Sequence, residues 1–194
     1  GIISYGFNKS HAIAYAYRSF QCGWLFTYYP IQWLKACLEK DPSLHGVLNT
    51  TRSMGYKIGK VDPLHSEVGT WQYVNDVFIP PLNSLKGVGD AGGKELVSNR
   101  HMNEINSFHD FFFTKTESLR WSKLNKNCIK SLIKAGAFSD ESSLKFVGSD
   151  KTFIHNRAFF EFVEECWEDF KKGKDMAEYI KACNEVPDWT DMEK

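Results

Sequence analysis

Residues 4–15 read SYGFNKSHAIAY and place polar and aromatic side chains at the start of a helix. We expect this helix to run from Ser10 to Tyr29, because apolar residues recur every three or four positions and Pro30 marks its end. Asn8 or Ser10 is the expected N-cap. A helix start of this kind offers free backbone N–H groups and a partial positive charge, both of which suit a phosphate group.

Four side chains of this stretch are candidates for nucleotide binding: Tyr5, Lys9, Ser10 and His11. Lys9 adds a full positive charge beside the helix start, and Tyr5 offers an aromatic face on which a base can stack. His11 could donate a hydrogen bond to a phosphate or crowd a sugar. A capped helix with a solvated lysine and an aromatic core contact explains the same residues, and taken alone they favour that explanation.

The rest of the chain predicts a mostly α fold with one small β-hairpin. The hairpin is expected from residues 71–74 and 77–79, which flank the turn dipeptide Asn75-Asp76. Further helices are expected at residues 31–39, 43–54, 123–134, 153–171 and 175–183, and residues 82–100 read as helix, glycine turn, helix. These changes of pattern divide the chain into residues 1–55, 56–138 and 139–194.

Residues 86–89 read KGVG and form a candidate site for DNA. The two glycines, Gly87 and Gly89, let backbone amides approach a phosphate closely, and the following helix presents its N-terminal end. Such a helix-hairpin-helix holds the DNA backbone without reading sequence, and Lys86 and Lys94 would add a salt-sensitive attraction. A tight turn between two helices explains the glycines equally well.

Charged residues are spread unevenly, although the formal net charge of the 194-residue chain is zero. Residues 86–134 carry nine basic and five acidic side chains, which would suit a protein whose middle faces phosphates. Basic residues recur every three or four positions from Arg120 to Lys134, and a solvated helix face explains them better than a template groove. Gly92 and Gly93 should weaken their helix by about 1 kcal/mol each, which makes the glycine turn a weaker candidate than the nucleotide site.

Five cysteines are scattered through the chain with no CxxC pair, so neither a disulfide framework nor a zinc site is expected. Reduced core thiols in a cytoplasmic protein are the expected state. No apolar run is long enough to span a bilayer, so no membrane partner is expected. The phenylalanine-rich run FHDFFF at residues 108–113 is expected in the core.

Several short stretches stand in a consistent order: YGFNKSHAIAYAY at 5–17, YYPIQWLKACL at 28–38, MGYKI at 54–58, LKGVG at 85–89 and LIKAGAF at 132–138. Together they resemble the fingers region, with its helix-hairpin-helix, of the C-family replicative DNA polymerases of bacteria and phages, the family of the DNA polymerase III alpha subunit. The first stretch is specific, whereas KGVG alone is a weak motif.

This resemblance implies a helical fingers module that meets the incoming dNTP and the template-primer DNA. Tyr5 would lie against the nascent base pair, and His11 would lie near the sugar and help to exclude ribonucleotides. Lys9 and Ser10 would lie near the triphosphate or hold the helix start. The KGVG turn would contact the DNA backbone.

Nucleotidyl transfer needs clustered carboxylates that hold two metal ions, and the resemblance places these in a palm upstream of the fingers. The sequence has no DxD-type cluster in a suitable extended context. We therefore expect the chain to bind no cofactor itself, with Mg²⁺ implied for the complete polymerase, and to need a palm-bearing polypeptide or the rest of the same chain for activity. The alternative is a nonenzymatic helix-hairpin-helix module, whose DNA binding would depend on Lys86 and Gly87 but ignore Tyr5 and His11.

Overall fold

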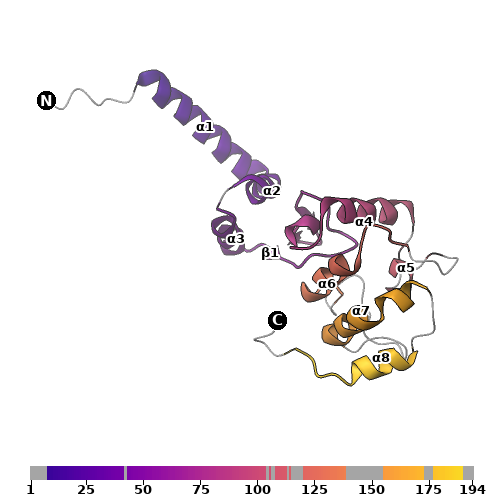
Figure 1. Ribbon diagram of the computed structural model, residues 1–194. Helices are drawn as coiled ribbons and strands as arrows, with labels where there is room; N and C mark the ends of the chain where they lie inside the picture. Colours follow the sequence, from indigo (N-terminus) through magenta and orange to yellow (C-terminus); the bar gives the residue numbers. More distant parts are fainter. Residues whose placement is uncertain are drawn as a thin grey trace. The chain divides into compact units, whose positions relative to one another are not determined.

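The computed structural model describes residues 8–41, 43–103, 105, 108–112, 114, 120–138, 155–172 and 177–189 (Figure 1). In this described part, eight α-helices and one three-stranded sheet confirm the predicted mostly α fold. The chain divides into two compact units, Gly1–Gly55 and Tyr56–Lys194. The division into three domains stays a prediction.

Three helices make up the described part of the first unit: α1 (Lys9–Tyr28), α2 (Pro30–Lys40) and α3 (Leu44–Ser53). Asn8 is the N-cap of α1, because its side chain accepts a hydrogen bond from the Ser10 N–H at 3.2 Å. Pro30 is the first residue of α2, a position where its missing N–H costs nothing. The helices therefore begin and end within one or two residues of the predicted positions.

The long helix α1 buries none of its side chains against the described residues. Its large apolar side chains are exposed, among them Ile13 at 59% and Phe20 at 68%. The buried side chains of this unit lie on α2 and α3: Leu34, Leu38 and Thr51. The apolar spacing thus predicts the helix correctly without showing what covers it.

A small sheet opens the second unit and consists of β1 (Lys57–Ile58), β2 (Gln72–Val74) and β3 (Val77–Ile79). The strand order is β1-β3-β2, with β3 antiparallel to β2 and parallel to β1. Asn75 and Asp76 form the turn with φ values of 49° and 63°, the left-handed pair that a two-residue hairpin needs. The predicted hairpin is confirmed, and β1 adds a third strand whose parallel pairing with β3 was not predicted.

Helices make up most of the second unit: the 3₁₀ turn η1 (Leu82–Ser84), α4 (Asp90–Met102), α5 (Phe108–Phe112), α6 (Lys126–Lys134), α7 (Asn156–Lys171) and α8 (Ala177–Asn184). The helix expected from Lys123 begins three residues later, because backbone N–H groups of residues 122–124 bind a side chain of α4 instead. Helix α7 packs against both α6 and α8. The loop expected at residues 139–150 lies outside the described residues.

Aromatic side chains form the centre of the second unit. Phe111, Phe112, Phe138 and Phe159 are fully buried, and their contacting pairs have ring centroids 5.0 to 6.2 Å apart. Tilted and edge-on pairs of this kind add to the stabilisation from burial. Phe111 and Phe112 of the FHDFFF run are therefore core residues, as predicted. All five cysteines are free thiols, and those of α6, α7 and α8 are buried.

Candidate nucleic-acid interface

The glycine hairpin between η1 and α4 buries the side chain of Val88 and is exposed on both sides of it. Val88 is only 4% exposed, and its N–H donates to the carbonyl oxygen of Leu85 at 3.1 Å. Its neighbours Lys86, Gly87 and Gly89 are exposed. One apolar side chain therefore ties the hairpin to the core, while the glycines on either side are open to solvent.

Two side chains of α6 hold the carbonyl groups of the hairpin. The Ser131 hydroxyl donates to the carbonyl oxygen of Lys86 at 2.8 Å. The Cys128 thiol donates to the carbonyl oxygen of Gly87, with 3.1 Å between sulfur and oxygen. Neither contact has a local sequence signal, because α6 lies more than forty residues further along the chain.

The two hairpin glycines have different structural requirements. Gly87 has a φ of +99°, and a Cβ atom there would lie 2.5 Å from the hydroxyl oxygen of Ser131. Gly89 has a φ of −80°, and among the described atoms none lies within 4 Å of the position of its Cβ. Gly87 is therefore required by the fold, whereas Gly89 could carry a side chain without any clash inside the described chain.

The first turn of α4 directly follows the hairpin and presents backbone N–H groups. Gly89 is the N-cap, and in the part that the structure describes no side chain bonds to these N–H groups. The Asp90 carboxylate accepts a hydrogen bond from the Asn83 amide at 2.9 Å. Lys86 lies in the hairpin and Lys94 in the second turn of α4, and both are exposed. The predicted DNA-binding residues thus belong to the hairpin and the first two turns of α4.

Gly92 and Gly93 lie on the buried side of α4, and close packing explains why they are glycines. A Cβ at Gly92 would lie 3.3 Å from the carbonyl oxygen of Lys123, and a Cβ at Gly93 would lie 2.8 Å from a methyl of Val68. Each glycine is expected to weaken the helix, but each also lets a neighbouring segment approach α4 closely.

Glu95, in the second turn of α4, joins this helix to the start of α6. Its carboxylate accepts hydrogen bonds of 2.7 to 2.9 Å from the backbone N–H groups of residues 122–124, and another from the Ser122 hydroxyl. Partial burial disfavours the charged carboxylate, but the hydrogen bonds outweigh burial and hold the pKa of Glu95 below its usual value. Asn125 then caps α6 by accepting from the Cys128 N–H at 3.1 Å.

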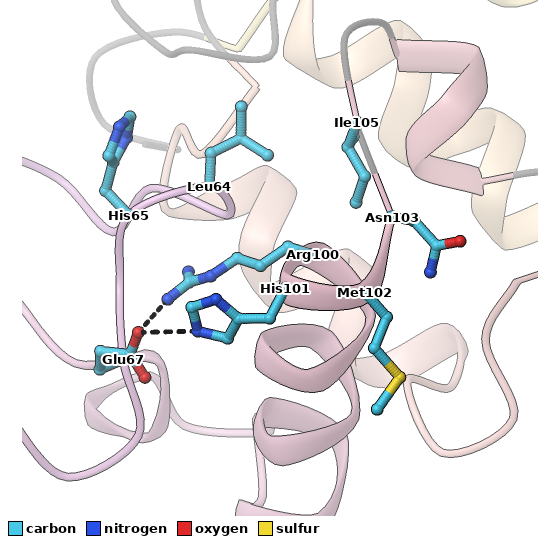
Figure 2. Close-up of a pocket in the computed structure, with 8 residues that line it drawn as sticks. All are labelled: Leu64, His65, Glu67, Arg100, His101, Met102, Asn103 and Ile105. Carbon is cyan, nitrogen blue, oxygen red and sulfur yellow. Dashed lines mark hydrogen bonds and ion pairs between the residues drawn. The ribbon is translucent and has the colours of Figure 1, made fainter.

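Arg100 fixes the far end of α4 to the segment that follows β1. Its guanidinium donates to the carbonyl oxygens of Ser66 at 2.6 Å and Pro63 at 3.3 Å, and it pairs with the Glu67 carboxylate (Figure 2). His101 Nε2 lies 3.8 Å from the same carboxylate. Glu67, Arg100 and His101 line an open cavity of about 670 Å³. The Arg100 side chain is only 8% exposed, so this charge belongs to the fold and is not presented to a ligand.

Basic residues of α6 contact α7 at the surface, and the solvated face expected of them stays a prediction. Lys126 and Lys130 both pair with Glu164, and the hydrogen bond from Lys130 lowers the pKa of that carboxyl. The ammonium groups of Lys130 and Lys134 lie 4.7 and 4.8 Å from the ring centroid of Phe160. Periodic spacing alone could not reveal these partners, because they lie on a helix about thirty residues away in the sequence.

Three of the four nucleotide-binding candidates lie at the start of α1, in the first unit. Lys9, Ser10 and His11 are all exposed. The Ser10 hydroxyl donates to the N-cap side chain at 2.9 Å, and the His11 ring lies edge-on to Tyr15 with 4.5 Å between centroids. Tyr5 lies outside the described residues. The first turn of α1 thus brings three of the four candidates together.

Within the described ranges, His, Cys, Asp and Glu side chains form no group of three that could hold a metal ion. None of the helices in the described part is long and apolar enough to cross a bilayer. The described site is therefore a surface built from a hairpin backbone, a helix start and two lysines. Such a surface suits the phosphate groups of a nucleic acid.

Residues 55–145 match the protein family described as "Helix-hairpin-helix motif", and the glycine hairpin lies within this span. The predicted helix-hairpin-helix segment is thereby confirmed.

Comparison with curated proteins is more specific. The chain is 33% identical over 141 residues to the DNA polymerase III subunit alpha of Xylella fastidiosa (strain Temecula1). It is 31% identical over 143 residues to that of Campylobacter jejuni and 33% identical over 140 residues to that of Aquifex aeolicus. Each match covers 70% of this chain and 12% of the relative. The matched part of this chain is similar to one region of the DNA polymerase III alpha subunit.

Proposed function

We propose that this chain is the fingers portion of a replicative DNA polymerase, which holds template-primer DNA by its backbone and meets the incoming dNTP. The observation that carries the proposal is the hairpin at residues 86–89. The glycines of this hairpin are exposed, and contacts with the core and with α6 fix its conformation. The hairpin leads directly into the start of α4, which has no side-chain cap. The relatives are polymerase subunits, and their activity is extended to this chain by similarity.

The hairpin would bind DNA through phosphate oxygens. Backbone N–H groups around Gly87 and Gly89 and in the first turn of α4 would donate to a phosphate, aided by the partial positive charge of the helix start. Lys86 and Lys94 would displace counterions and make the affinity salt-dependent. Contacts of this kind hold a duplex in register without reading its sequence, as a replicative polymerase requires.

The start of α1 would contact the incoming nucleotide. In this proposal Tyr5 lies against the nascent base pair, Lys9 and Ser10 lie near the triphosphate, and His11 lies near the sugar. Mg²⁺ for nucleotidyl transfer would be held by carboxylates of a palm, supplied by a partner polypeptide or by another part of the same chain, since the described residues offer no group that fits the metal.

The decisive first experiment measures duplex DNA binding by this chain with fluorescence anisotropy over a range of salt concentrations. We expect a dissociation constant of about 10⁻⁴ to 10⁻⁶ M, as for sequence-independent binding. Gly89→Ala should weaken binding about tenfold, because a methyl would stand between the phosphate and the backbone. It should cost at most about 1 kcal/mol of stability, the usual effect at an N-cap. Lys86→Ala should make the salt dependence shallower, by about 0.9 in log K against log salt for each phosphate that the variant no longer neutralises.

Lys181→Ala is the matched charge control, since Lys181 is exposed on α8 and away from the hairpin. It should leave both affinity and salt dependence nearly unchanged. Equal binding by the wild-type chain and Gly89→Ala would overturn the hairpin as the DNA contact. DNA binding that depends on Lys86 and Gly87 but is indifferent to Tyr5 and His11 would favour a nonenzymatic DNA-binding module.

A further inference from the structure

Hydrogen bonds of defined direction, and not packing alone, join α6 to the hairpin. Ser131 and Cys128 lie one turn apart on α6 and donate to two consecutive carbonyl groups, those of Lys86 and Gly87. A peptide group is planar, with its C=O and N–H pointing in opposite directions. Fixing two consecutive carbonyls therefore fixes the direction of the N–H groups on the other side of the same peptide planes.

We infer that Ser131 and Cys128 are positioning residues, which hold the hairpin so that the backbone N–H of Gly87 is presented to a DNA phosphate. This inference rests on the proposed DNA contact. Because the Lys86 carbonyl points to Ser131, the N–H of Gly87 points away from α6. The next N–H, that of Val88, closes the turn onto Leu85.

The close fit between α6 and the hairpin supports a specific arrangement. The Ser131 hydroxyl occupies the space that a side chain at residue 87 would need, since a Cβ there would lie 2.5 Å from its oxygen. Cys128 is 4% exposed, so water competes little for its bond, whereas the bond from the half-buried Ser131 to the exposed Lys86 is more open to water. The hydroxyl is the stronger donor of the two, and the thiol is the weaker.

Removing these two hydrogen-bond donors would lower DNA affinity, because the free chain would then sample other conformations of the hairpin. An unheld hairpin with a glycine at its centre samples other backbone conformations. If only a tenth of the molecules keep the binding-competent form, the apparent affinity falls tenfold, although every group that touches DNA is unchanged. A positioning function therefore predicts weaker binding together with a more mobile hairpin.

The test compares the wild-type chain with Ser131→Ala, Cys128→Ala and the double variant. Duplex DNA affinity is measured by anisotropy, and deuterium uptake of residues 82–92 is measured in the free chain. We expect the double variant to bind about tenfold more weakly and to take up deuterium faster in this segment alone. Cys128→Ser, which keeps a donor, should bind more tightly than Cys128→Ala. Ser84→Ala is the matched control, because its hydroxyl bonds to Pro81 and not to the hairpin carbonyls.

The outcomes separate this inference from the proposed function. If wild-type binding depends on Gly89 but the Ser131 and Cys128 variants bind DNA as the wild type does, the positioning function is wrong and the DNA contact stands. If Gly89→Ala has no effect, the DNA contact itself fails. Faster deuterium uptake throughout the second unit would indicate general destabilisation and would also overturn the positioning function. Should the double variant not fold, Ser131→Ala alone decides, since it removes only a half-buried hydroxyl from α6.

Discussion

Three side chains determine the geometry of the proposed DNA contact: those of Glu95, Ser131 and Cys128. Glu95 receives its hydrogen bonds from the chain that leads into α6, and Ser131 and Cys128 of α6 hold the hairpin in turn. Glu95 therefore acts on the hairpin indirectly, because it fixes where α6 begins. A carboxylate in this position stabilises the fold only while it is ionised.

Glu95→Gln should lower the free energy of unfolding by about 1–2 kcal/mol at pH 7, since an amide accepts fewer and weaker hydrogen bonds than a carboxylate. The folded-state pKa of Glu95 lies below the unfolded value, so the stabilisation is present above the unfolded pKa and is lost as pH falls through the folded one. Urea titrations between pH 7 and acid should therefore show the variant losing less stability than the wild type. An identical pH dependence for the two proteins would show that Glu95 does not make this contribution.

At the scale of the helix, α4 owes its close packing to two glycines, and α1 contains a glycine with no such role. A Cβ on Gly93 would lie 2.8 Å from Val68, whereas among the described atoms none lies within 4 Å of a Cβ on Gly23. Gly93→Ala should destabilise the protein by about 1–3 kcal/mol through overpacking, partly offset by better helix propensity. Gly23→Ala should stabilise α1 by about 0.5–1 kcal/mol. Thermal unfolding of both variants checks the pair, and equal shifts in the same direction would contradict the packing account of α4.

The elements predicted from sequence are those whose signals are local. Asn8 before α1, the Asn75-Asp76 turn and the KGVG hairpin each lie within a few residues of the structure that they specify. The parallel pairing of β1 with β3 and the bonds from α6 to the hairpin join residues about twenty to forty-five positions apart. Periodicity contains no information on such partners, which is why Ser131, Cys128 and Glu95 were missed as part of the candidate site.

At the scale of the whole molecule, the two units contain two different parts of the proposed function. The second unit contains the helix-hairpin-helix, and the first contains the candidates for nucleotide contact. The chain spans 12% of the length of the curated relatives it matches. The proposal therefore concerns a complete polymerase, whose remainder is a partner polypeptide or the rest of the same chain. Nucleotide selection has to be tested in that complete polymerase.

His11→Ala in a polymerase assembly that contains this chain should raise ribonucleotide incorporation about tenfold, because removing the imidazole would open space beside the sugar for a 2′-hydroxyl. The exposed ring of His11, held edge-on to Tyr15 at the start of α1, is the structural reason to choose this residue. Alkali-sensitive sites in the extended primer measure the effect. His45→Ala, an exposed histidine of α3, is the control and should leave incorporation unchanged. Unchanged sugar discrimination in His11→Ala, with primer extension intact, would remove His11 from the nucleotide site and leave the helix-hairpin-helix as the part of the proposal still supported.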